Sequence, residues 1–205
     1  MKIYNVGEQK SVMNRFIAEL RDKQIQKDSL RFRRNLERIG ELFAYEISKQ
    51  LKYEERDVQT PLGIAKCQLP ADKVVVASIL RAGLPLHQGV LNIFDSAQNA
   101  FIAAYRKYGK DNKFKIQMEY ATMPSIEGKT VVLVDPMLAT GSSIILAYNK
   151  ICTNGEPLHT HIVAAIASRE SLSLLSKNLP HSKVTLWVGA VDEELTNKSY
   201  IVPGL

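Results

Sequence analysis

Apolar residues in the first quarter of the chain recur every three or four positions. The members of this stripe are Phe32, Leu36, Ile39, Phe43 and Ile47. Such a period places all five side chains on one face of a helix. Asp28 and Ser29 come just before the stripe and are residue types that cap helix N-termini. The pattern predicts an amphipathic helix within a helical N-terminal segment that covers residues 1–55.

From residue 74 onward, short apolar runs alternate with helical stretches. The runs are VVVASIL (74–80), NAFIAAY (99–105), TVVLVD (130–135), HIVAAIA (161–167) and VTLWV (184–188). Strands that are apolar on both faces belong to a parallel sheet that helices cover on both sides. We therefore expect an open, mostly parallel α/β sheet flanked by helices, with ligand-binding residues just after the strands end.

Two further segments have the pattern of strand pairs. Residues 56–69 mix β-branched and polar residues around Pro61-Leu62-Gly63, which predicts a hairpin that turns there. Polar and apolar residues alternate from Lys113 to Tyr120, which predicts a projecting hairpin arm over residues 107–129 with a basic root. Two interpretations of this arm stay open: an oligomer contact or charged edge strand, and a lid over the substrate.

Composition fits one globular domain over residues 1–205. Hydrophobic residues make up 45% of the chain and charged residues 23%, which excludes disordered, collagenous and disulfide-scaffold proteins. No apolar run approaches the roughly 18 residues that span a bilayer, so we expect no membrane partner. The first residues lack the apolar stretch of a signal peptide, which favours a cytoplasmic protein with Cys67 and Cys152 reduced. These cysteines have no metal-binding spacing.

The net charge of +6 favours an anionic partner. A nucleic-acid footprint would gather basic residues on one face. The arginines of the first quarter instead alternate with or closely precede glutamates. They are Arg31, Arg33, Arg34 and Arg38, with Glu37, Glu41 and Glu46. We favour a solvated helix face over RNA binding for this segment, so nucleic acid is an unlikely partner.

The strongest local signal is TVVLVDPMLATGSS, residues 130–143, followed by the helical IILAYNKI. A buried strand ends in Asp135, a loop of small and hydroxyl residues follows, and a helix begins. Free N–H groups at the start of a helix, aided by its dipole, attract anions and above all phosphate. The P-loop and dinucleotide fingerprints are both absent. The alternative reading makes Thr140, Ser142 and Ser143 ordinary helix caps.

The string VDPMLATG resembles the PRPP-binding motif of type I phosphoribosyltransferases, in the Asp-Pro variant typical of uracil phosphoribosyltransferases. Three more matches follow the family order. SILRAGLP (78–85) resembles the loop that receives pyrophosphate, AYR (104–106) a segment with a second phosphate-binding arginine, and YIVPGL (200–205) the uracil-recognition segment. The likeness runs from about residue 29 to the end of the sequence.

The resemblance implies transfer of the 5-phosphoribosyl group from PRPP to uracil, giving UMP and diphosphate in pyrimidine salvage. It implies catalytic roles for Arg81, Arg106 and Asp135, and uracil contacts from Ile201 and Tyr200. The residues implied to bind PRPP are Arg81, Arg106, Asp135, Pro136, Met137, Leu138, Ala139, Thr140, Gly141, Ser142 and Ser143. The implied cofactor is Mg²⁺, bound through PRPP with no dedicated protein metal site. GTP binding, known for some relatives, is implied too. The exposed two-stranded arm favours a homo-oligomer, dimer or higher.

Two features depart from the family pattern. The family continues past the equivalent of Leu205 with Gly-Asp-Ala, which supplies further contacts to uracil and PRPP. We expect either a longer native chain or an incomplete base pocket. Many relatives also have a second glycine at the position of Ser142, where serine is tolerated if φ is negative.

Two alternative functions are considered. The first is a type I phosphoribosyltransferase for another nucleobase, and the second is an RNA-binding regulator of pyrimidine operons built on the same fold.

Overall fold

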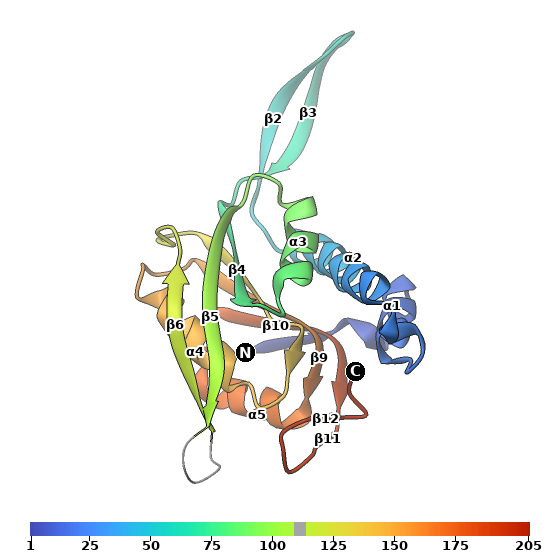
Figure 1. Ribbon diagram of the computed structural model, residues 1–205. Helices are drawn as coiled ribbons and strands as arrows, with labels where there is room; N and C mark the ends of the chain where they lie inside the picture. The colour runs from blue at the N-terminus through green and yellow to red at the C-terminus, as the bar shows by residue number, and fades with distance from the viewer. Residues whose placement is uncertain (109–113) are drawn as a thin grey trace.

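The computed structural model describes residues 1–108 and 114–205, and a large sheet runs through its centre (Figure 1). Its strands are β1 (Lys2–Asn5), β4 (Val74–Leu80), β5 (Gln98–Tyr108), β6 (Phe114–Thr122), β7 (Thr130–Val134), β8 (Met137–Leu138), β9 (His159–Ser168) and β10 (Val184–Asp192). The order is β1-β10-β9-β7-β4-β5-β6, and β8 pairs with β9. Every neighbouring pair is parallel except β5 with β6. The predicted open, mostly parallel sheet is confirmed.

Helices cover both faces of this sheet (Figure 1). The helices are α1 (Val12–Arg21), α2 (Ser29–Ser48), α3 (Leu84–Ile93), α4 (Ser142–Cys152) and α5 (Arg169–Asn178), with short 3₁₀ turns η1 (Val6–Glu8) and η2 (Ile25–Lys27). One apolar cluster joins α1, α2 and α3 to the sheet, and the other joins α4 and α5 to its opposite face. Alternate residues of each central strand enter opposite clusters, which explains why these strands are apolar on both faces.

The amphipathic helix predicted from the apolar stripe is α2. Ile39, Phe43 and Ile47 are fully buried in the α1–α3 cluster. The carboxylate of Asp28 caps the helix by accepting hydrogen bonds from the N–H groups of Leu30 and Arg31, both at 3.0 Å. Ser29 is the first residue of the helix rather than its cap.

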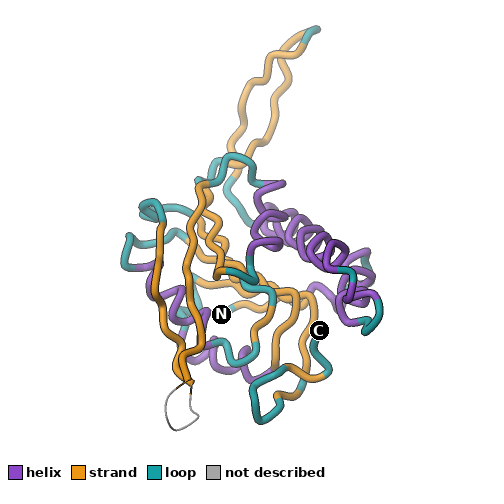
Figure 2. The backbone as a smooth tube through the Cα atoms, in the orientation of Figure 1, coloured by secondary structure: helices purple, strands orange, loops and turns teal. Residues whose placement is uncertain are grey.

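The hairpin predicted over residues 56–69 is formed by β2 (Tyr53–Thr60) and β3 (Gly63–Pro70). These strands form a separate two-stranded sheet that projects from the rest of the molecule (Figures 1 and 2). No buried hydrophobic residue of either core cluster belongs to residues 53–70, all of which the structure describes. The hairpin therefore has no core of its own, and we call it the β2–β3 arm.

The alternation near residue 113 corresponds to strand β6, which pairs antiparallel with β5 at the edge of the main sheet. The turn between them, residues 109–113, lies outside the described residues. The strand ends at Thr122, earlier than the predicted limit of Lys129. Pro124 cannot donate to a ladder, and Gly128 adopts a positive φ of 64° in the turn that follows.

Within the described ranges, we find no helix with the length and apolar character needed to cross a bilayer.

Candidate active site

The loops after β4 and β7 leave the sheet where its strand order reverses. β4 pairs with β5 on one side and with β7 on the other, and the chain continues in opposite directions from these two strands. In open α/β sheets, ligands bind in the crevice outside the carboxyl ends of strands at such a reversal. The two loops with the strongest sequence signals, at Arg81 and Asp135, thus start side by side.

The loop after β4 approaches the end of β7 closely at Gly83. A Cβ added at Gly83 would lie 2.4 Å from Ser78 Oγ, 2.8 Å from the Ile79 carbonyl and 3.2 Å from the Val134 carbonyl. Any other side chain would clash, so glycine is required for this approach. Arg81 and Ala82 are exposed above this contact, the Leu80–Arg81 peptide bond is cis, and α3 begins at Leu84.

The loop after β7 is held by backbone bonds to β9. The Asp135 N–H donates to the Val163 carbonyl at 3.1 Å. The Pro136 carbonyl accepts from the N–H groups of Ala165 at 3.0 Å and Ile166 at 3.2 Å. Pro136 and Leu138 are buried, whereas Met137 is exposed. This backbone pairing fixes the position from which the Asp135 side chain leaves the sheet.

Burial raises the pKa of Asp135 to about 7, and a hydrogen bond from the Met137 N–H offsets only part of this effect. A carboxyl in this state gains from a ligand that brings hydroxyl donors or a cation.

The loop continues into α4 through Gly141, whose φ of 82° lies in the left-handed region that glycine adopts freely. Ser142 begins the helix, so its backbone is helical, as serine requires here. Thr140 Oγ1 accepts from the Ser142 N–H at 3.4 Å and donates to Ser142 Oγ at 3.2 Å. Ser168 Oγ anchors the loop by donating to the Ala139 carbonyl at 2.5 Å. The first N–H groups of α4 thus follow a tightly held loop, a geometry that suits an anion.

Arg106 lies on β5 beyond the part of that strand that pairs with β4. Leu80, the last residue of β4, is in register with Ala103, and Arg106 follows three positions later opposite Ile116 of β6. Its backbone therefore extends from the same edge of the sheet as the Arg81 loop.

The predicted uracil segment forms a small sheet of β11 (Glu194–Leu195) and β12 (Ile201–Val202). Tyr200 is 64% exposed, Ile201 is half-buried, and the Val202–Pro203 peptide bond is cis. The segment follows β10, whose last residue, Asp192, lies in register with Ser168 at the end of β9. It thus emerges at the same edge of the sheet as the loops that follow β4 and β7.

Sequence reasoning missed three residues that hold these segments: Arg21, Ser168 and Asp192. Asp192 gave a usable signal, because it is an acidic residue just after an apolar stretch, as Asp135 is. Ser168 follows the run at residues 161–167 directly. Arg21 gave no such signal, because its hydrogen-bond partners, Asp192 and Gly204, lie 171 and 183 positions away in the sequence.

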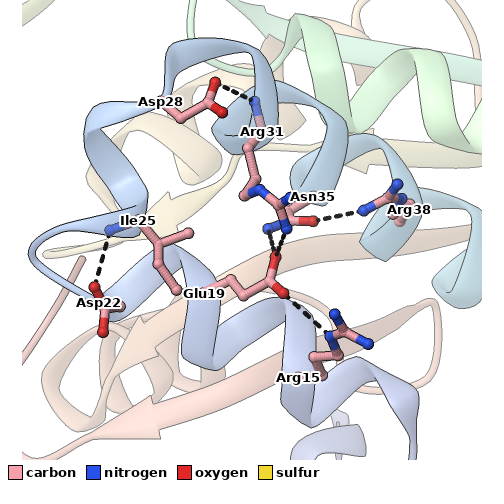
Figure 3. Close-up of polar contacts among 8 residues, drawn as sticks. All are labelled: Arg15, Glu19, Asp22, Ile25, Asp28, Arg31, Asn35 and Arg38. Atoms are coloured by element: carbon pink, nitrogen blue, oxygen red, sulfur yellow. Dashed lines mark hydrogen bonds and ion pairs between the residues drawn. The ribbon is translucent and has the colours of Figure 1, made fainter.

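The basic face of α2 is engaged with protein groups, as Figure 3 shows for its first turns. Arg31 Nη1 contacts Glu19 Oε2 at 3.1 Å, and Arg38 Nη1 donates to Asn35 Oδ1 at 3.1 Å. Arg34 pairs with Glu37 at 2.5 Å. These contacts support a solvated, ion-paired helix face rather than a surface for RNA.

The fold and the two adjoining loops define the class of protein: this is the type I phosphoribosyltransferase fold. A hypoxanthine phosphoribosyltransferase from Staphylococcus aureus, 13% identical, shares the fold with a TM-score of 0.53 over 78% of this chain and 74% of its own. The structure of the AQ2163 protein from Aquifex aeolicus, 30% identical, aligns with a TM-score of 0.87 over 99% of this chain and 93% of its own.

Sequence comparison narrows the class to one family. The family model for uracil phosphoribosyltransferase matches residues 7–205. A uracil phosphoribosyltransferase from Porphyromonas gingivalis is 50% identical over 100% of this chain and 94% of its own length. One from Thermococcus gammatolerans is 35% identical over 99% of this chain and 89% of its own. The chain belongs to the uracil phosphoribosyltransferase family, which confirms the resemblance noted from its motifs.

Proposed function

We propose that residues 1–205 act as one domain that transfers the 5-phosphoribosyl group of PRPP to N1 of uracil, giving UMP and diphosphate. Family membership supports the reaction. The observation that carries the site is the contact of Gly83 with the end of β7, because it brings the Arg81 loop against the residue that precedes Asp135. A substrate with phosphates at both ends of a ribose needs two anion sites joined in this way.

The proposed reaction breaks the bond from C1′ to the diphosphate oxygen and forms the bond from C1′ to N1, while the N1 proton passes to the departing diphosphate or to water. Negative charge gathers on the departing diphosphate while the ribose becomes positively charged. Arg81, and Arg106 from β5, stabilise the diphosphate, since guanidinium groups match phosphate oxygens well. The loop from Pro136 to Ser143 holds the 5′-phosphate at the start of α4.

Asp135 binds the ribose hydroxyls in this proposal, directly or through water. Mg²⁺ suits the site as a companion of PRPP, because it keeps several waters and relies on substrate phosphates. The described residues contain no cluster of three or more His, Cys, Asp or Glu side chains that could hold a metal alone. Asp135 is a half-buried carboxyl, which fits a cation that arrives with its own phosphate ligands. The carboxylate would neutralise part of the cation's charge.

Uracil is small and neutral, so in-plane hydrogen bonds from backbone groups read it best. We assign this role to the backbone of Ile201, with Tyr200 packing nearby. The half-buried position of Ile201 in β12 and the origin of the segment at the ligand edge of the sheet support this assignment.

We further propose a cytoplasmic homo-oligomer in which the β2–β3 arm contacts a second copy. One face of the arm carries the apolar side chains of Val58, Ala65, Cys67 and Leu69, together with the ion pair of Glu54 and Arg56, as the register places these residues together. A two-stranded hairpin without a core is marginally stable in water. Packing the apolar side chains of this face on another subunit would stabilise it.

The test is to incubate the purified protein with PRPP, Mg²⁺ and each of uracil, cytosine and hypoxanthine. We expect UMP and diphosphate in equal amounts from uracil, and little product from the other bases. Turnover of hypoxanthine or cytosine in preference to uracil would contradict the base assignment. A protein without product from any base, yet with strong salt-dependent RNA binding, would support the regulator instead.

A further inference from the structure

Three groups from distant parts of the chain meet at the far end of the uracil segment. Arg21, the last residue of α1, forms a forked pair with Asp192, with Nη1 to Oδ2 at 2.9 Å and Nη2 to Oδ1 at 2.7 Å. Arg21 Nη1 also donates to the Gly204 carbonyl at 2.7 Å. The Gly204 N–H donates to Asp192 Oδ2 at 3.0 Å. We call these three residues the Arg21 clamp.

The clamp uses both backbone hydrogen-bonding groups of Gly204, so it fixes the position and direction of this peptide. Asp192 is 6% exposed, and the Arg21 side chain is 23% exposed. Ion pairs shielded from water to this degree keep their geometry better than surface pairs do. The neighbouring Leu205 packs against the α1–α3 core cluster.

The conformation of Gly204 carries this constraint back to Ile201. Gly204 has a φ of 68°, and a Cβ at this position would lie 2.3 Å from the Ile201 carbonyl. The segment therefore turns back on itself between these two residues. At its other end, Ile201 pairs with Leu195, and the Thr196 N–H donates to the Tyr200 carbonyl at 2.8 Å. Ile201 is held between this pairing and the clamp.

The clamp is also linked to the phosphate loop. Asp192 and Ser168 lie in register at the ends of β10 and β9. Ser168 Oγ in turn holds the Ala139 carbonyl. Neighbouring strand ends thus set the positions of both the uracil segment and the loop assigned to the 5′-phosphate.

From this geometry we propose that Arg21 and Asp192 are positioning residues for uracil, which act by holding the 201–204 turn in register with the phosphate loop. The proposal rests on the function proposed above. Neither residue needs to touch the base. Arg21 acts by donating a hydrogen bond to the Gly204 carbonyl, and Asp192 acts by accepting one from the Gly204 N–H.

The test compares Arg21→Gln, Arg21→Lys and Asp192→Asn with the wild-type protein in steady-state assays. A misplacement of about 1 Å, even one caused by a change far from the reacting atoms, can cost about 10²-fold in rate. We expect Arg21→Gln and Asp192→Asn to raise the KM for uracil by about tenfold or more, while the KM for PRPP changes less than about twofold. Arg21→Lys keeps the charge but not the fork, so it should recover part of the loss.

Arg15→Gln is the matched control, because Arg15 lies on the same helix and pairs with Glu19 at the exposed surface. It should leave both KM values unchanged. Hydrogen exchange gives a second readout: amides of residues 196–205 should exchange faster in Arg21→Gln than in Arg15→Gln. If Arg21→Gln does not fold, Arg21→Lys and Asp192→Asn provide the same comparison.

Equal increases in the KM for uracil and for PRPP, or a lower melting temperature with unchanged KM values, would overturn the positioning role. A wild-type protein that makes no UMP would instead overturn the function itself, and this assignment with it. Wild-type activity combined with unaltered uracil kinetics in all the clamp variants would overturn the clamp alone.

Discussion

Arg81 shows how an exposed residue on a buried scaffold separates function from stability. Its side chain lies outside both core clusters, while the loop under it is locked by Gly83. We expect Arg81→Ala to lower kcat/KM for PRPP by about 10²–10³, the scale of losing one preorganised donor to a developing anion. Thermal unfolding should stay unchanged. Arg33→Ala, an exposed arginine on α2, is the control and should alter neither quantity.

Asp135 carries a pKa raised to about 7 by burial, so its charge changes near neutral pH. If its carboxylate binds the ribose, kcat/KM for PRPP should fall by about tenfold per pH unit below about pH 7. Asp135→Asn should be much less active and should lose this inflection. A pH profile that keeps its inflection in the variant would assign the titration to another group.

The same raised pKa predicts how stability depends on pH. The ordinary value is 3.8 and the folded value about 7, so the folded state binds the extra proton between these limits. Stability from this group is therefore highest below about pH 4 and falls as the pH rises to about 7. Asp135→Asn should melt at a higher temperature than the wild type at pH 8. The difference should shrink toward zero near pH 4, in calorimetry of both proteins without ligand.

Glu19 of α1 joins this helix to α2 through Arg31 and Asn35 (Figure 3). Because the contact depends on an ionised carboxylate, we expect acid to weaken it. Hydrogen bonds from Asn35 and Arg15, followed by the contribution of Arg31, lower the pKa of Glu19 from 4.5 to about 2. The stabilisation is therefore complete above about pH 4.5 and is lost as the pH falls toward 2. Glu19→Gln should melt below the wild type at pH 7, and the two should converge by pH 2. A constant difference in melting temperature from pH 7 to pH 2 would show that the charge of Glu19 does not contribute to stability.

The β2–β3 arm allows a test of assembly that leaves the core intact. Val58 and Ile64 are both exposed β-branched residues, but the register places them on opposite faces of the hairpin. Val58→Glu should break the proposed oligomer, because it puts an unpaired charge where Ala65, Cys67 and Leu69 supply the apolar contact. Ile64→Glu should leave the oligomer whole. Light scattering after size-exclusion chromatography measures both, and a wild-type monomer would contradict the proposal at once.

Across the molecule, local patterns were enough to predict the parallel sheet and the loop that holds Asp135. The reason is that a doubly buried strand and the loop after it are contiguous in the chain. Two features were beyond such patterns. Local patterns predicted both hairpins, but which one stands free of the main sheet depends on distant neighbours. The clamp joins residue 21 to residues 192 and 204, and no local pattern records that pairing.

The pairing of β1 with β10 has a consequence for synthesis of the protein. Lys2 lies in register with Thr185, so β1 leaves the ribosome long before its partner strand. At about 5–20 residues per second, the intervening chain takes on the order of 10–40 s to make. Throughout that time β1 has no partner strand, and α1 lacks the β10 side of its packing surface. Nascent chains should therefore depend on chaperones and be cut readily by proteases near residues 2–21, which become protected once β10 has emerged.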